Sequence, residues 1–179
     1  QFVADGFGTE RRDVMYNDFV IVGPADDPAG IAGAESASDA LAMIAEAGAV
    51  FVTRGDDSGT EKKELKLWED AGVTPEGEWY VSTGQGMGDT LKIASEKAGY
   101  TLSDRATYLS MRDALDLEVS FEKSDDLINQ YGVTPVTDAI NAEGADAFME
   151  WITGEGGQAV IETYGIEEYG EPLFIPNAG

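Results

Sequence analysis

The stretch FVTRGDDSGTEKKE, residues 51–64, leads from a β-forming run through a polar loop into a helix. Phe51 and Val52 favour a strand, and they are followed by a loop rich in glycine and aspartate. Ser58 and Glu61 fit the capping-box pattern S-x-x-E, which predicts that a helix begins at or near Ser58. A strand that passes directly into a helix is the basic unit of α/β proteins.

The same alternation extends outward in both directions and predicts an α/β fold. Leu65 and Trp68 are expected on the buried side of the central helix. We also expect Trp79, Tyr80, Phe148 and Trp151 to lie in a core. Strands are predicted at 13–24, 49–53, 78–83, 100–103, 117–122 and 131–136 and near the end of the chain, and helices at 36–49, 58–71, 86–99, 104–115 and 144–165, the last interrupted near Gly154.

The composition narrows the classes of function. Asp and Glu number 35 against 11 Lys and Arg, and the formal charge of −24 argues against binding to nucleic acid or anionic lipid. Hydrophobic residues make up 42% of the chain, which is enough for a packed core. The acidic residues are spread along the whole sequence, a pattern that suits a protein working in high salt and predicts a halophilic origin. An ordinary acidic, soluble protein is the alternative.

The chain contains neither cysteine nor histidine. Thiolate chemistry, Ser-His-Asp catalysis and the commonest zinc ligands are therefore excluded. No nucleophile–base pair is visible, so we predict a protein that is not an enzyme and has no cofactor or metal centre. The opening residues, QFVADGFG, resemble the middle of a protein, and we expect upstream sequence before them.

The loop before the central helix carries a candidate anion site. The first-turn N–H groups of a helix lack intrahelical acceptors, and the helix dipole is positive there. Gly59 would let a ligand approach the backbone closely, while Ser58 and Thr60 offer hydroxyl groups and Arg54 offers a charged, two-pronged donor. A well-capped helix with no ligand explains the same residues equally well on local evidence.

Two further turns could add donors. TGQGMGDT, residues 83–90, has the spacing G-x-G-x-G and so lacks the G-x-G-x-x-G dinucleotide pattern. Gly86 and Met87 would present backbone N–H groups there, although a tight turn alone also explains the glycines. In SDRATYLS, residues 103–110, Thr107 or Tyr108 could contribute to a cleft, with simple helix capping as the alternative.

Four long motifs resemble the periplasmic or extracellular tungstate-binding proteins of ABC transporters. They are DVMYNDFVIVGPADDPAGI, RGDDSGTEKKELKLW, WYVSTGQGMGDTLKIASEKAGYTLSDRATYL and YGVTPV. The resemblance implies a type II periplasmic-binding-protein-like α/β fold with one complete lobe and part of a second. Residues 1–21 would be a remnant of the first lobe with the first crossing strand. Residues 22–131 would form the complete lobe, and residues 132–179 would hold the second crossing strand and the rest of the first lobe.

The resemblance also implies the ligand and the partner. A small oxyanion, tungstate or molybdate, would bind Arg54, Ser58, Gly59 and Thr60 and the turn Gly84–Gly88. An ABC permease would receive it outside the cell, with the full-length protein anchored to the membrane. Family members begin with a segment that has no match here, so we expect an N-terminally truncated, haloarchaeal member with half of the anion site. Apolar surface exposed on the incomplete lobe would favour self-association.

One position departs from the family pattern, because Glu61 stands where relatives commonly carry histidine. Two other functions remain open. The same R-x-x-x-S-G-T arrangement would suit a phosphate or sulfate receptor. The fold would also suit the ligand-sensing domain of a regulator.

Overall fold

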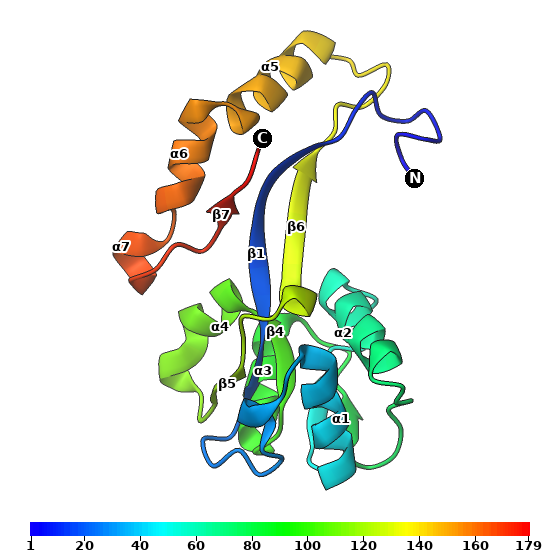
Figure 1. Ribbon diagram of the computed structural model, residues 1–179, viewed down its shortest axis with the longest axis vertical. Coiled ribbons are helices and arrows are strands. Elements are labelled where there is room, and N and C mark those ends of the chain that lie inside the picture. Colours follow the sequence, from blue (N-terminus) through cyan, green and yellow to red (C-terminus); the bar gives the residue numbers. More distant parts are fainter. The chain divides into compact units, whose positions relative to one another are not determined.

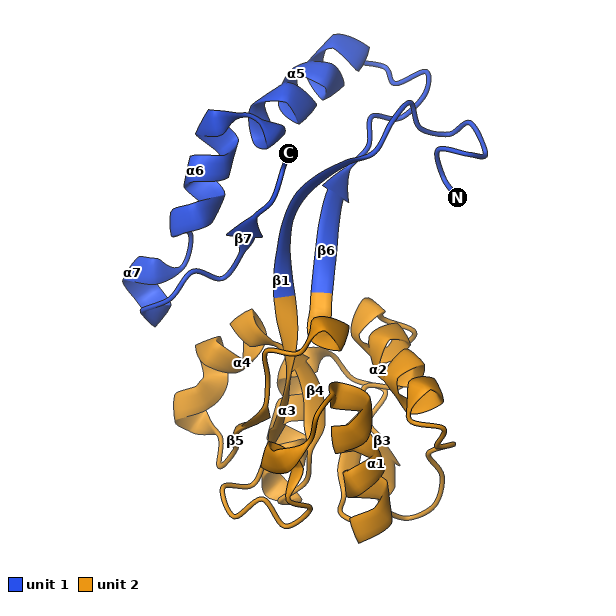
Figure 2. Ribbon diagram, in the orientation of Figure 1, with its two compact units in different colours: residues 1–17, 129–179 blue, residues 18–128 orange.

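The computed structural model describes residues 1–179 and divides into two compact units (Figures 1 and 2). Unit 1 comprises residues 1–17 and 129–179, and unit 2 comprises residues 18–128. The chain changes unit within strand β1 (Arg12–Gly23) and at the start of strand β6 (Ile128–Val133). The lobe limits expected from the sequence, after residues 21 and 131, remain a proposal about the whole protein.

Unit 2 alternates strands and helices, in agreement with the predicted α/β class, and its strands form a sheet in two parts. Its strands, besides the second half of β1, are β2 (Phe51–Thr53), β3 (Tyr80–Ser82), β4 (Thr101–Asp104) and β5 (Glu118–Phe121). β1 pairs antiparallel with β4 and β5, whereas β2 and β3 run parallel. The Val52 amide donates to the Tyr100 carbonyl at 2.8 Å, which joins the β2–β3 pair to the start of β4.

Four α-helices surround this sheet: α1 (Ala37–Ala47), α2 (Gly59–Asp70), α3 (Met87–Glu96) and α4 (Arg105–Met111). Short 3-10 turns cover Ile31–Gly33, Arg112–Ala114 and Asp125–Leu127. The core lies between the sheet and α1 and α2, where Phe51 meets Trp68 edge to face at 5.2 Å. The prediction for Trp68 is confirmed, but Leu65 is 47% exposed because the buried stripe of α2 instead contains Leu67.

Unit 1 holds the first half of β1, which pairs with β6 and with β7 (Ile175–Pro176). Three helices follow β6: α5 (Ala142–Thr153), α6 (Glu155–Thr163) and α7 (Ile166–Tyr169). The predicted interruption at Gly154 is confirmed, since this residue ends α5 and caps α6. The short helix α7 was missed by the sequence patterns. None of the helices has the length and apolar character needed to cross a membrane.

The aromatic residues of α5 differ from the expectation that they belong to a core. Phe148 and Trp151 are 52% and 51% exposed and face each other with ring centroids 5.9 Å apart. Met149 is the buried residue of this helix. Apolar residues occur on more than one side of α5, so helical spacing alone could not tell which side is covered. Trp79 and Tyr80 are partly buried beside the core of unit 2.

Candidate functional site

The candidate site begins where β2 ends and α2 starts. The Ser58 hydroxyl accepts the Glu61 amide at 3.3 Å, so Ser58 is the N-cap that the sequence predicted. The capping box differs in one bond, because the Glu61 carboxylate accepts the amide of Asp57 and not that of Ser58. The Ser58 amide instead donates to Asp56 Oδ1 at 3.2 Å. The N-cap is therefore held from both sides without involving the amides of the first two helical residues.

Arg54 lies directly beside this helix start, with its side chain only 19% exposed. Its Nε and Nη2 donate to Asp56 Oδ2 at 3.1 and 2.5 Å. Its Nη1 lies 3.5 Å from the Thr60 hydroxyl oxygen. The pKa of Asp56 is lowered, first by hydrogen bonding from the Ser58 side chain and then by Arg54 and the Ser58 amide, against the cost of burial. The carboxylate is therefore ionised and keeps the guanidinium against α2.

The turn after β3 lies against the Arg54 loop. The Thr83 hydroxyl donates to the carbonyls of Thr53 and Arg54 at 3.2 Å each and lies 3.0 Å from the Thr90 hydroxyl in α3. Gly55 adopts a φ of +62°, and a Cβ there would come within 1.9 Å of the Ser82 hydroxyl oxygen. This close approach requires glycine and brings the starts of α2 and α3 to the same edge of the parallel strand pair.

Both helix starts present backbone donors without acceptors. At α2, the amides of Gly59 and Thr60 have no hydrogen-bond partner. At α3, Gly86 is the N-cap but has no side chain to bond, and the amides of Met87 and Gly88 have no partner. Helix N-termini with unpaired amides attract anions. The structure thus brings six of the seven predicted residues to one edge: Arg54, Ser58, Gly59, Thr60, Gly86 and Met87.

Thr107, the seventh residue, has local partners of its own. Its amide and its hydroxyl both donate to the carboxylate of Asp104, the N-cap of α4, at 2.8 Å. This is the helix-capping alternative that the sequence left open. A role for Thr107 in anion binding stays a prediction. Thr83 and Thr90, in contrast, were not singled out from the sequence, and their only signal was a threonine at a strand end and another in the following helix.

A buried carboxylate lies on the same face of α2, one turn after Thr60. Glu64 is 2% exposed and accepts hydrogen bonds from the Tyr80 hydroxyl at 2.7 Å and the Trp68 indole at 3.1 Å. Burial raises the pKa of Glu64 to about 6, and these hydrogen bonds oppose the rise. No local pattern distinguishes Glu64 from the other acidic residues of the chain, which number 35 in total with it.

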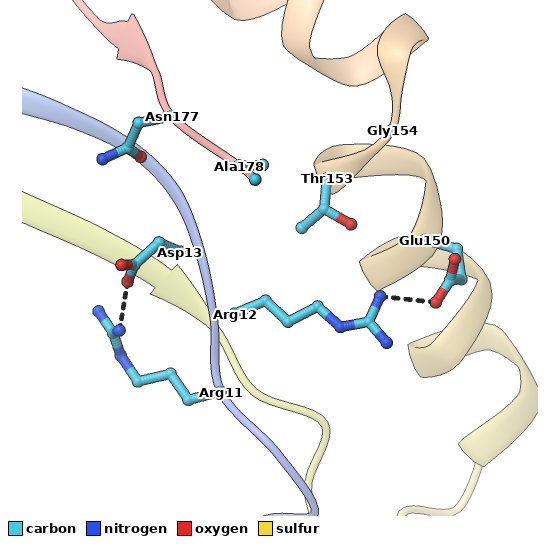
Figure 3. Close-up of a pocket in the computed structure, with 9 residues that line it drawn as sticks. Arg11, Arg12, Asp13, Glu150, Thr153, Gly154, Asn177 and Ala178 are labelled. Atoms are coloured by element: carbon cyan, nitrogen blue, oxygen red, sulfur yellow. Dashed lines mark hydrogen bonds and ion pairs between the residues drawn. The ribbon is translucent and has the colours of Figure 1, made fainter.

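Unit 1 contains an open pocket of about 660 Å³ (Figure 3). Its cations are already paired, since Arg12 contacts Glu150 at 2.7 Å and Glu10 at 2.9 Å, and Arg11 contacts Asp13. None of the predicted site residues lies in it. The pocket is lined by Arg11, Arg12, Asp13, Glu150, Thr153, Gly154, Asn177, Ala178 and Gly179.

Comparison with known proteins places this arrangement in a class. A model described as a PBP superfamily domain matches residues 1–155. The solved tungstate-binding protein TupA from Desulfovibrio alaskensis G20 superposes with a TM-score of 0.89 at 42% identity, over 99% of this chain and 74% of that one. Fold and match together define a domain of the periplasmic-binding-protein superfamily.

Two relatives refine the assignment. The tungstate-binding protein TupA of Peptoclostridium acidaminophilum is 56% identical over 99% of this chain, and a Haloferax volcanii protein named for anion binding in an ABC transporter is 53% identical over 99%. The chain belongs to the family of the tungstate-binding protein TupA. It spans 64% of the length of the first relative and 54% of the second.

Proposed function

We propose that this protein is the solute-binding component of an ABC importer and that it captures tungstate. The observation that carries this proposal is the edge of unit 2, where Arg54 lies beside the start of α2 and the turn before α3 packs on the same loop, both helix starts having unpaired amides. The similarity to TupA proteins supports tungstate as the ligand. Molybdate has the same charge and shape, and it is the alternative ligand of the same site.

Each residue has a distinct role in this proposal. Arg54 supplies the single positive charge, and Ser58 and Thr60 supply hydroxyl groups close to it. The backbone amides of Gly59, Gly86 and Met87 add neutral donors. A tetrahedral dianion needs several converging donors, and unpaired helix amides provide them without adding charges to an acidic chain.

Thr107 is the weakest member of the proposed site. Its hydroxyl would have to leave Asp104 to reach a ligand. We therefore assign it the smallest share of the affinity.

The function ends with binding and delivery. TupA proteins are solute-binding proteins and not enzymes, and the anion would leave unchanged for the membrane permease. We place this step outside the cell, with membrane anchoring and self-association as further expectations. The exposed aromatic pair of α5 supports self-association. The haloarchaeal relative supports the halophilic origin expected from the charge.

The test is calorimetric titration of the full-length protein with tungstate, molybdate, sulfate and phosphate in molar salt. We expect tight binding of tungstate and much weaker binding of sulfate and phosphate. Preferential phosphate binding without a response to tungstate would refute the proposal. Comparing tungstate with molybdate in the same titrations would decide between the two ligands.

A further inference from the structure

Two neighbouring aspartates at the start of α2 have different surroundings. The side chain of Asp57 is 91% exposed and pairs with Lys62 Nζ at 3.1 Å. The side chain of Asp56 is 22% exposed and pairs with Arg54. Both residues lie in the same loop and carry the same charge. This pair offers a built-in comparison between a carboxylate that holds the site cation and one that does not.

Asp56 connects the cation to the helix. One carboxylate oxygen, Oδ2, accepts hydrogen bonds from both Nε and Nη2 of Arg54. The other, Oδ1, accepts one from the Ser58 amide. The guanidinium is thereby fixed relative to the N-cap of α2. An arginine has five N–H groups. The Asp56 and Thr60 contacts use three of them and leave one on each terminal nitrogen.

We infer that Asp56 is a positioning residue for anion binding, which acts by fixing Arg54 so that its remaining N–H groups and the α2 amides meet the same oxyanion. The inference rests on the function proposed above. Both oxygens of Asp56 already accept hydrogen bonds from the protein, so Asp56 itself makes no contact with the ligand. Its effect on affinity should therefore be the same for every tetrahedral dianion.

Charge alone predicts the opposite effect. Removing a carboxylate near a bound dianion relieves repulsion and should tighten binding. In 1 M salt the screening length falls to about 3 Å, which suppresses this contribution. If neutralising Asp56 then weakens binding, the cause is that the Arg54 guanidinium is no longer held in place.

The experiment compares Asp56→Asn with Asp57→Asn in the full-length protein, titrated with tungstate, molybdate and sulfate in 1 M salt. We expect Asp56→Asn to weaken binding by about tenfold for each anion, a loss typical of residues coupled in one network. Asp57→Asn should stay within about twofold of wild type, as expected for an exposed charge. Equal affinities for the two variants would overturn the inference, and so would tighter binding by Asp56→Asn or an effect confined to one anion.

A second readout follows the guanidinium directly. The NMR signal of the Arg54 Nε–H group should shift and exchange faster with water in Asp56→Asn but not in Asp57→Asn. An unchanged signal in Asp56→Asn would contradict the positioning role even if affinity fell. If the wild-type protein does not bind tungstate, the proposed function fails, while this signal still reports whether Asp56 holds Arg54.

Discussion

Helices α1 and α2 begin in the same way but differ in what lies over their first turn. In each, the hydroxyl of a serine N-cap accepts a hydrogen bond from the backbone amide three residues later. Ser36 accepts from Asp39, and Ser58 accepts from Glu61. At α1, the amides of the two residues directly after the N-cap, Ala37 and Ser38, donate to the carboxylate of Asp126 at 3.2 Å each. At α2, the corresponding amides of Gly59 and Thr60 have no acceptor. One helix end is closed by the protein itself, and the other, the open end, keeps two unpaired amides.

The buried faces of the two helices differ as well. The buried residues of α1 are all apolar. Those of α2 include Thr60 and Glu64 beside Leu67 and Trp68. Polar groups in a buried stripe cost stability unless they are bonded. α2 therefore combines an open end with polar residues on its buried face. We expect such a face where binding, and not packing alone, selects the residues.

The largest expected effect is at the open end. Replacing Arg54 with alanine should weaken tungstate binding at least a hundredfold, about 3 kcal/mol, because the site loses its only charged donor. Calorimetry of the full-length variant would measure the loss, and circular dichroism would verify the fold. Arg112→Ala is the matched control, since that side chain is half exposed and pairs only with Asp113. Unchanged affinity in Arg54→Ala would refute the open-end site.

The next effect concerns the polar interior of α2. The pKa of Glu64 is raised by burial from 4.5 to about 6. Below pH 4.5 the carboxyl is protonated in both the folded and the unfolded chain. Between pH 4.5 and 6 the unfolded chain releases the proton first, so rising pH favours unfolding by roughly 2 kcal/mol at most.

Glu64→Gln removes this titration and can still accept the Tyr80 and Trp68 hydrogen bonds. The free energy of unfolding of wild type minus that of Glu64→Gln should therefore fall between pH 4.5 and 7 and then level off. Urea denaturation at several pH values would measure it, with the exposed Glu69→Gln as control. A difference that does not change with pH would contradict the raised pKa.

A smaller effect is expected at the closed end. Asp126→Ala should lower the free energy of unfolding by about 1 kcal/mol, because two amides and the positive end of α1 lose their carboxylate. The neighbouring Asp125 is exposed and makes no such bonds, so Asp125→Ala should leave stability unchanged. Denaturation of both variants would measure this. Tungstate affinity should be unaffected, and a parallel loss of affinity would show that the two helix ends are not independent.

The sequence predicted the strands and helices of unit 2 because their local signals agree: apolar runs for strands, helical spacing of apolar residues for helices, and glycine at the turns. It also predicted the open end, since Ser58, Gly59 and Arg54 lie within five residues of one another. It could not predict the closed end, because Asp126 is far from α1 in the chain and one acid among 35 carries no local signal. The burial of Glu64 and the exposure of Phe148 and Trp151 could not be predicted either, because burial depends on long-range packing.

The smallest expected effect lies at a third helix start, that of α4. There the carboxylate of the N-cap Asp104 accepts hydrogen bonds from both the amide and the hydroxyl of Thr107. This helix end is therefore closed by a residue of its own first turn. Thr107→Val keeps the amide bond and removes only the hydroxyl, and we expect tungstate affinity to change by less than about twofold. Thr60→Val, at the open end, should cost about tenfold because its hydroxyl lies beside Arg54 and two unpaired amides. Equal losses in the two variants would show that Thr107 turns from Asp104 to the ligand, and that a capped helix end can still open for an anion.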